Sequence, residues 1–206
     1  MAHGCLAPFR ILRVIAISRP PEVPGTPGTL VVMNHQSVWD IPIMIWLVKD
    51  NFVRIVTRAR YVRRYLPTVS KMVMLFGFPV VNPGFQGREL RRSLLEMKSA
   101  ARKDDAPLGI FPEGTRTKDG EIGEFRTAGM KVLLRARPWT VHALVSDGLW
   151  RQAKVKHLVA SPEAVSARVE HAGVFEWSDP RADADPFIDG IRRRMVEKLH
   201  EMRRAA

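Results

Sequence analysis

The sequence predicts an α/β fold: a single-domain αβ sandwich with one mixed sheet flanked by helices, plus an N-terminal amphipathic helix. Short apolar runs alternate with amphipathic helical segments, which is typical of this class. The 206 residues, 46% of them hydrophobic, can bury one core without disulfides or a structural metal. We expect one domain over 1–206, made of an N-terminal amphipathic segment and linker (1–28), a motif-bearing core (29–150) and C-terminal strands with an amphipathic helix (151–206).

The N-terminal elements follow from local patterns. Residues 5–17 carry apolar side chains at helical spacing, so we expect an amphipathic helix that docks on the protein's own core or contacts a membrane. The proline- and glycine-rich stretch 19–28 is a linker. Residues 30–33 form a short buried strand, and a helix begins near 37–40, where Pro42 is tolerated in the first turn.

The rest of the chain continues the alternation. We expect helices at 89–103, around 132–134 (ended by Pro138) and along 188–202, where apolar residues recur at helical spacing. The expected strands, of which the last two have the weaker patterns, lie at 53–57, 78–81, 108–111, 141–145, 155–159 and 169–175.

The charge balance indicates an anionic partner. Thirty-three Lys and Arg against 21 Asp and Glu give a formal net charge of +12, which favours nucleic acid, an acidic membrane or a phosphorylated metabolite. Residues 51–88 contain no acidic residue and include the apolar run 72–78, so we expect an anionic membrane surface as partner. The alternative is a solvated basic face beside a buried strand. No nucleic-acid-binding signature is present, so no nucleic-acid partner is expected.

Targeting and metal signals are absent from the sequence. No run approaches the roughly 20 apolar residues that span a bilayer, and residues 5–17 lack the features of a signal peptide. We therefore expect a peripheral or monotopic protein on the cytoplasmic side of a membrane. The single cysteine excludes a disulfide framework, and no histidines have metal-ligand spacing, so no metal site is expected.

His35 and Asp40 form the first candidate pair for chemistry. On a continuous helix they would point about 140° apart, because each residue turns by about 100°. They can meet only if His35 lies on the turn before the helix and Asp40 in its first turn. The carboxylate could then accept the Nδ1–H and leave Nε2 as a base. Alternatively, Ser37 caps the helix and Asp40 completes a capping-box pattern, and both interpretations can hold together.

Residues 111–116, Phe-Pro-Glu-Gly-Thr-Arg, are the second candidate. A strand that ends in a glycine-containing turn offers backbone N–H groups, the Thr115 hydroxyl and the Arg116 guanidinium, a set that suits a phosphate monoester. A carboxylate is unfavourable beside phosphate, so we expect Glu113 to orient Arg116 or a substrate hydroxyl. Taken alone, this hexapeptide would be interpreted as an ordinary strand-to-loop turn.

Together, NHQSVWD (34–40) and FPEGTR (111–116) resemble the His-x4-Asp and FPEGTR blocks of the glycerolipid acyltransferases, the 1-acylglycerol-3-phosphate acyltransferase family. The resemblance covers residues 28–150. It implies an αβ sandwich beside an apolar tunnel for the acyl chain. It also implies transfer of a fatty acyl group from acyl-CoA or acyl-carrier protein to a lysophospholipid hydroxyl. No cofactor beyond that donor is expected.

The resemblance also implies roles for individual residues. His35 would be the general base on the acceptor hydroxyl, and Asp40 its orienting partner, with direct attack on the thioester. Glu113, Gly114 and Arg116 would hold the phosphate of the acceptor, 1-acylglycerol-3-phosphate.

One departure from the family pattern bears on the acceptor. The family's second block usually reads Gly-x-x-Phe-Ile-Asp-Arg, and the aligned stretch 77–83 ends in Pro83 where that arginine belongs. In the family the arginine helps to bind the acceptor phosphate. Arg88 or Arg58 could replace it, and we include Arg88 among the expected substrate-binding residues. The departure leaves another lyso-lipid or another amphiphilic alcohol open as acceptor.

Two other functions fit the sequence less well. A hydrolase with Ser37 as nucleophile lacks the Gly-x-Ser-x-Gly elbow, and Ser37 is too close in sequence to His35 for good geometry. A non-catalytic module of the same fold that binds anionic membranes is less consistent with two intact motifs. The acyltransferase is therefore the favoured interpretation, and the sequence leaves the oligomeric state open.

Overall fold

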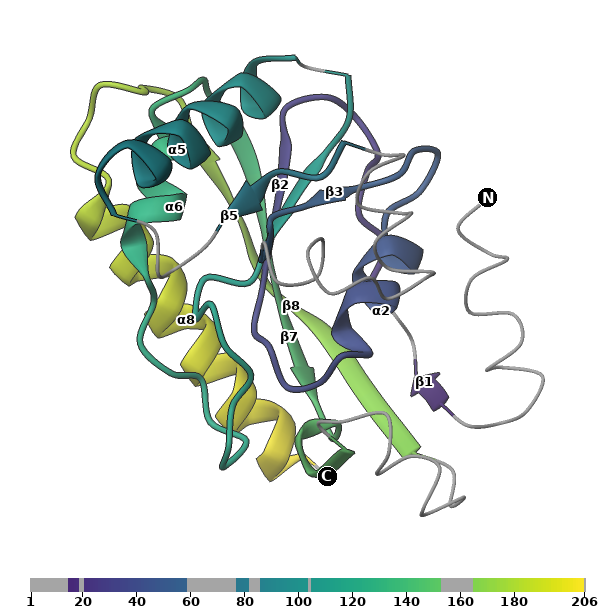
Figure 1. The fold of residues 1–206 in the computed structure, drawn as a ribbon. Helices are drawn as coiled ribbons and strands as arrows, with labels where there is room; N and C mark the ends of the chain where they lie inside the picture. Colours follow the sequence, from purple (N-terminus) through teal and green to yellow (C-terminus); the bar gives the residue numbers. More distant parts are fainter. Residues whose placement is uncertain are drawn as a thin grey trace.

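A six-stranded mixed sheet forms the centre of the computed structural model (Figure 1). Strand β8 runs antiparallel to β7, and every other neighbouring pair in this sheet is parallel. In spatial order the strands are β1 (Ile15–Ser18), β8 (Val165–Trp177), β7 (Trp139–Asp147), β2 (Thr29–Met33), β6 (Leu108–Ile110) and β3 (Arg54–Ile55). The structure describes residues 15–18, 21–58, 77–81, 86–103, 105–152 and 165–205.

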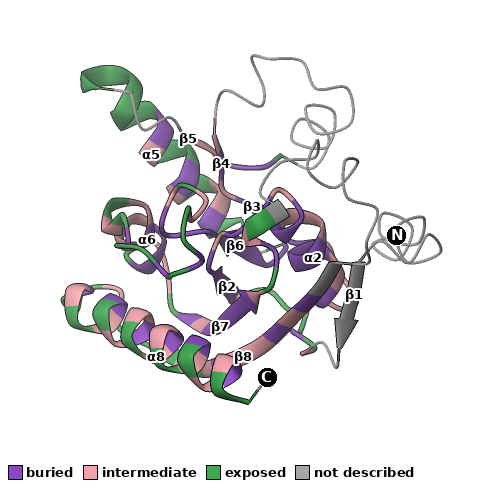
Figure 2. Ribbon diagram, turned by 90° about the horizontal axis from the view of Figure 1, so that it is seen from below, coloured by how far each residue is buried: buried purple, intermediate pink, exposed green. Residues whose placement is uncertain are grey.

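Helices cover both faces of the sheet. Along β2, Leu30 and Val32 belong to one apolar cluster, and Val31 and Met33 belong to the other, because side chains alternate across a strand. Helix α2 (Asp40–Leu47) packs on the Val31 side. Three helices pack on the Leu30 side (Figure 1), namely α5 (Gly87–Arg102), α6 (Thr127–Leu134) and α8 (Asp185–Arg204). The central strands are consequently buried on both faces (Figure 2).

The C-terminal helix shows how the sequence pattern produces this packing. Five apolar side chains of α8 recur every three or four residues, and each is at most 2% exposed. Burying one such side chain contributes about 1.5–3 kcal/mol, so this stripe fixes the helix on the sheet. The stripe consists of Ile188, Ile191, Met195, Leu199 and Met202.

A second, two-stranded sheet interrupts the strand expected at 53–57. The Val56 N–H still donates to the Gly109 carbonyl next to β6, but the Thr57 N–H donates to the Pro79 carbonyl. The chain therefore changes partner at this point. It leaves the main sheet as β4 (Thr57–Arg58) and pairs in parallel with β5 (Val80–Val81).

The other expected elements are mostly confirmed. The helices expected at 89–103, 132–134 and 188–202 correspond to α5, α6 and α8, and the strands at 30–33, 108–111, 141–145 and 169–175 are present. A short 3-10 helix, Trp150–Gln152, was not expected. The strand expected at 155–159 lies outside the described residues.

The helix expected over residues 5–17 was wrong at its C-terminal end. Ile15–Ser18 form strand β1, which pairs in parallel with Val165–Arg168 at the edge of the main sheet. Backbone hydrogen bonding to β8 outweighs the helical spacing of these residues. Residues 1–14 lie outside the described part of the chain. Within that described part, no helix has the length and apolar character needed to cross a membrane.

This topology places both sequence motifs at one edge of the sheet. Strands β6 and β7 flank β2 on either side and run parallel to it, so the carboxyl ends of the three strands lie together. Residues 34–40 follow β2, residues 111–117 follow β6, and residues 147–149 follow β7. Open α/β sheets place their ligand sites at this edge.

Candidate active site

His35 and Asp40 meet as their spacing requires. His35 lies in the turn after β2, and Asp40 is the first residue of α2. The imidazole Nδ1 lies 3.0 Å from the Asp40 Oδ2 atom, and that carboxylate is fully buried. A buried carboxylate beside Nδ1 favours the tautomer that carries its proton there, which leaves Nε2 as the basic nitrogen.

The same carboxylate holds the turn that presents the histidine. The backbone N–H groups of Gln36 and Ser37 both donate to Asp40 Oδ2 at 2.6 Å, and the Ser146 hydroxyl lies 3.4 Å from Oδ1. The N-cap position is Trp39 and not Ser37 as expected, and the Ser37 hydroxyl accepts the Trp39 N–H at 3.4 Å. Asp40 satisfies these N–H groups from inside the helix.

Glu113 joins the two motifs through backbone atoms. Its Oε1 accepts the His35 N–H at 2.8 Å, and its Oε2 accepts the Gly123 N–H at 3.0 Å. Burial raises the pKa of this carboxyl group, and the two N–H donors oppose the rise. The Thr117 N–H donates to the His35 carbonyl at 2.8 Å. His35 is therefore fixed through its N–H, its carbonyl and its ring.

The residues on either side of His35 anchor the turn to β7. The Asn34 amide donates to the Ser146 carbonyl at 2.9 Å and accepts the Ser146 N–H at 2.7 Å. Gln36 accepts the Leu149 N–H at 3.1 Å and donates to Asp147 at 3.1 Å. Because both amides are buried, these bonds replace the water that the groups have in the unfolded chain.

Further hydrogen bonds link the turn after β2 to the C-terminal helix α8 through Asp147. The Arg203 guanidinium contacts both carboxylate oxygens of Asp147, at 3.1 and 3.2 Å, and donates to the Gly120 carbonyl at 2.8 Å. Burial acts to raise the pKa of Asp147, but the bonds from Arg203 and Gln36 outweigh it and the pKa is lowered. Asp147 thus stays ionised between the two donors.

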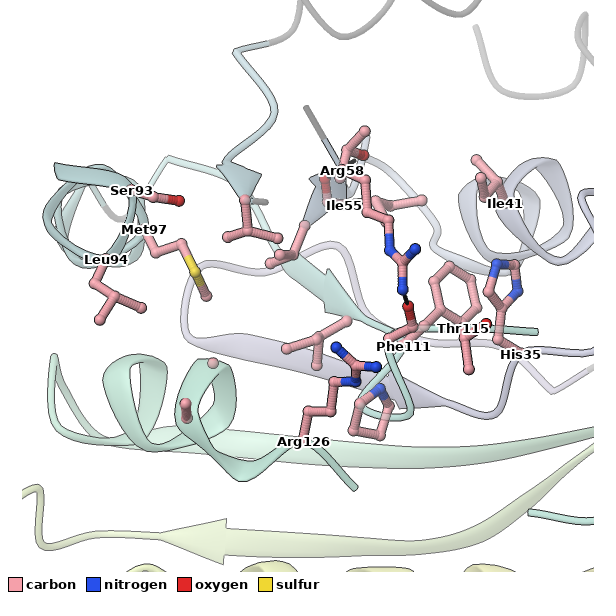
Figure 3. Close-up of a pocket in the computed structure, with 18 of the residues that line it drawn as sticks. His35, Ile41, Ile55, Arg58, Ser93, Leu94, Met97, Phe111, Thr115 and Arg126 are labelled. Carbon is pink, nitrogen blue, oxygen red and sulfur yellow. Dashed lines mark hydrogen bonds between the residues drawn. The ribbon is translucent and has the colours of Figure 1, made fainter. Parts of the chain in front are cut away.

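A cavity of about 440 Å³ opens from His35 (Figure 3). The imidazole stacks on the Phe111 ring at one end, with centroids 4.3 Å apart and planes 23° apart. Ser93, Leu94 and Met97 of α5 lie at the other end of the view in Figure 3. The lining between and around these ends is largely aliphatic and includes Ile41, Ile55, Val81, Leu94, Met97 and Ile110.

Among the described residues, three arginines line the same cavity. Arg58 donates to the Gly114 carbonyl; in Figure 3 its side chain extends from β4, and the Arg126 side chain extends from the opposite direction, from the stretch before α6. Arg116 also belongs to the lining. Cations around a cavity that also holds an imidazole favour an anionic ligand.

The predicted binding residues are partly brought together. Gly114, Thr115 and Arg116 line the cavity. Glu113 is 5% exposed and bonds to backbone N–H groups, so it lies behind the lining and not at its surface. Arg88 is exposed at the start of α5 and is not among the described residues that line the cavity.

Gly114 is required by the shape of the turn. Its φ of +62° lies in the left-handed region, where side chains are strained. An added Cβ would also lie 2.9 Å from the Arg126 Cδ atom. The glycine therefore lets the arginine side chain pass close to the backbone.

The arrangement comprises a histidine beside a buried carboxylate, an aliphatic cavity and, among the described residues, three arginines. A match to a family model, described as Acyltransferase, spans residues 14–146. The chain belongs to the acyltransferase family. Both motifs lie inside the matched region, and the fold agrees with the expected αβ sandwich.

Relatives and a solved structure support this membership. A Chlamydomonas reinhardtii protein named 1-acyl-sn-glycerol-3-phosphate acyltransferase is 27% identical over 203 residues, which cover 96% of this chain and 56% of that protein. A Borreliella burgdorferi protein of the same name is 25% identical over 127 residues, 59% of this chain and 46% of that protein. This acyltransferase chain spans about a third to just over half the length of the curated relatives it matches.

The fold similarity extends to a crystal structure. The 1-acyl-sn-glycerophosphate (LPA) acyltransferase PlsC from Thermotoga maritima superposes with a TM-score of 0.64 at 17% identity, covering 90% of this chain and 72% of that one. At this identity the likeness establishes the shared acyltransferase fold.

Sequence reasoning missed several residues of the site. Asn34, Gln36 and Ser146 were given no role, although their side chains position the turn. Arg126 was also missed. Its signal was an arginine directly before a helix start, in the stretch that continues the second motif. The side chain has no carboxylate partner among the described residues.

Proposed function

We propose that this chain transfers a fatty acyl group from a thioester donor, acyl-CoA or acyl-carrier protein, to the free hydroxyl of 1-acylglycerol-3-phosphate. The observation that carries the proposal is the His35–Asp40 pair at one end of an aliphatic cavity that three arginines also line. Membership of the acyltransferase family supports the reaction class. The relatives' names support the choice of acceptor.

In the proposed reaction, Nε2 of His35 takes the proton of the acceptor hydroxyl as its oxygen attacks the thioester carbonyl. The tetrahedral intermediate then collapses, the C–S bond breaks, and the imidazolium returns the proton to the leaving thiolate. Asp40 is buried and ionisable beside Nδ1, so it stabilises the transient imidazolium. No acyl-enzyme and no metal enters these steps.

In this proposal the arginines bind the polar end of the acceptor and the aliphatic lining binds an acyl chain. Arg58, Arg116 and Arg126 would hold the acceptor phosphate, because guanidinium groups bind two phosphate oxygens at once. In this proposal Arg58 takes the place of the arginine that the family's second block usually supplies. The aliphatic lining between Ile55 and Met97 would receive an acyl chain.

The first test is thiol release from acyl-CoA with and without 1-acylglycerol-3-phosphate. We expect release that depends on the acceptor, and a loss of at least about 100-fold in His35→Ala, because general-base catalysis contributes roughly 10²–10⁴-fold. The exposed His200 on α8 provides the matched control, and His200→Ala should keep full activity. Acceptor-independent release would instead indicate a thioesterase. The same assay with acyl-carrier protein decides the donor.

A second test addresses the arginines. Arg126→Ala should raise the KM for 1-acylglycerol-3-phosphate by roughly tenfold or more, since a charge-assisted hydrogen bond contributes about 1.5–3 kcal/mol. The KM for a neutral acceptor such as a monoacylglycerol should change little. Equal effects on the two acceptors would contradict a phosphate-binding role.

A further inference from the structure

The outward face of α5 combines cations with an exposed leucine. Leu95 is 58% exposed, and Arg88, Arg91 and Arg102 are also exposed. Figure 2 shows that much of α5 is exposed. At about 100° per residue, these three arginines and the half-buried Lys98 fall within an arc of roughly 80° that also contains Leu95. We call these five residues the α5 basic face.

The acidic residues of this helix lie elsewhere. Glu89 and Glu96 are one above the other on a different side, at least roughly 80° beyond the edge of the α5 basic face. Glu96 is already paired with Arg92 at 3.1 Å. In the part of the chain that the structure describes, no carboxylate pairs with the cations of the α5 basic face. Their charge is therefore available to an external anionic surface.

The α5 basic face adjoins the cavity that holds His35. Leu90 and Leu94 line that cavity and also line a second groove, of about 400 Å³, between α5 and the C-terminal end of α6. Arg91 and Lys98 of α5 line this groove, together with Arg135 at the end of α6. The cavity that holds His35 and the α5 basic face therefore lie on two sides of the same helix.

We propose that the α5 basic face docks on an anionic lipid surface, with Leu95 inserted among the headgroups. An exposed leucine surrounded by long cationic side chains suits a fluid interface, because the aliphatic stems can lie along the hydrocarbon boundary while the charges stay at the headgroups. A lipid surface requires no matching shape, and each cation near it adds to binding. The inference rests on the proposed function in one respect: a lipid acceptor would then reach His35 from the membrane beside α5.

The first test is sedimentation with vesicles of phosphatidylcholine containing 30% phosphatidylglycerol, compared with pure phosphatidylcholine. Each cation near an anionic surface contributes about fivefold to the partition coefficient. Arg91→Ala/Lys98→Ala should therefore weaken binding to the anionic vesicles by about 25-fold. The control Arg181→Ala/Arg193→Ala removes the same charge from exposed positions outside α5 and should change binding little. Equal losses in both double variants would overturn the proposal, since only net charge would matter.

Leu95 provides a test that does not depend on charge. Leu95→Ala should weaken binding by roughly fivefold, because about half of a leucine side chain becomes available for burial in the interface. Val174, an exposed aliphatic residue on β8 at 54%, is the matched control, and Val174→Ala should have no effect. Retention of wild-type binding by Leu95→Ala would overturn the insertion of this side chain.

Vesicle binding and acyl transfer can fail separately. His35→Ala should bind vesicles like the wild type, whereas Arg91→Ala/Lys98→Ala should retain transfer to acceptor presented in detergent micelles. If the latter variant binds vesicles normally but loses activity only with acyl-carrier protein as donor, the α5 basic face recognises an acidic protein and the lipid proposal falls. If no variant transfers acyl groups while vesicle binding depends on the α5 basic face, the proposed function falls and the docking surface stands.

Discussion

Asp40 is expected to matter more for stability than the histidine beside it. The sharpest comparison is Asp40→Ala with His35→Ala, since either change should abolish the proposed reaction. The carboxylate accepts two backbone N–H groups at 2.6 Å, from Gln36 and Ser37, and both residues are buried. Removing it leaves both donors without an acceptor in a place that water does not reach.

The magnitude follows from those two donors. A buried N–H group without a partner costs about 1–3 kcal/mol, so Asp40→Ala should lower the free energy of unfolding by about 2–6 kcal/mol. His35→Ala removes a largely buried ring, with its side chain 14% exposed, and its stacking on Phe111, which contributes about 1 kcal/mol. A domain of this size has about 5–15 kcal/mol of stability in total, so the difference is large.

Asparagine separates the charge from the geometry. In Asp40→Asn the amide oxygen can still accept the two N–H groups, and the amide nitrogen can face the Ser146 hydroxyl, which is able to accept. We expect a loss of about 1–2 kcal/mol, because charge-assisted hydrogen bonds are roughly twice as strong as neutral ones. Activity should nevertheless fall strongly, because the imidazolium loses its ionised partner.

The assay is urea unfolding at pH 7, followed by circular dichroism, for the wild type and the three variants. The slope with urea should stay unchanged, so that shifts of the midpoint report stability alone. If Asp40→Ala unfolds within about 0.5 kcal/mol of His35→Ala, the carboxylate does not hold the turn. Asp40 would then act on the histidine alone.

Three further changes follow from the same structure. Gly114→Ala should reduce activity and stability together, since φ is +62° and the new Cβ would lie 2.9 Å from an arginine side-chain atom; wild-type kinetics would contradict this. Burial lowers the pKa of both His142 and His171, so the unfolded chain binds more protons and the free energy of unfolding should fall as the pH drops below 6.5. Replacing both with Phe should flatten this slope by at most about 1.4 kcal/mol per pH unit for each imidazole, while His200→Gln should retain it. Arg203→Ala should lower kcat with little effect on KM, measured by acyl transfer, because it frees the residues that hold the turn; unchanged kcat would limit the arginine to a structural role.

The relation of His35 to Asp40 could be predicted from the sequence because it is local. Five residues separate them, and helix geometry allows contact only if a turn precedes the helix. The strand before the motif and Pro42 in the first turn of the following helix indicated a turn at His35 and a helix start near Asp40. The structure confirms the turn, with Nδ1 and Oδ2 3.0 Å apart.

The role of Glu113 could not be predicted in the same way. Its partners are two backbone N–H groups, and one of them belongs to His35, 78 positions earlier in the sequence. Every residue except proline offers a backbone N–H, so no pattern of side chains marks which one a carboxylate will find. The same holds for Asn34, which bonds to the backbone of Ser146, 112 positions away.

The missing family arginine shows how the sheet can supply what a motif lacks. In the family pattern the arginine would stand at position 83, two residues after Val81 in the sequence. Val81 lines the cavity and lies opposite Arg58 in the parallel pairing of β4 with β5. The neighbouring strand β4 therefore brings an arginine next to Val81, from 25 residues before position 83 in the sequence. Arg88 is closer to position 83 along the chain but is carried outward by α5, so proximity in sequence favoured a residue that the fold places outside the cavity.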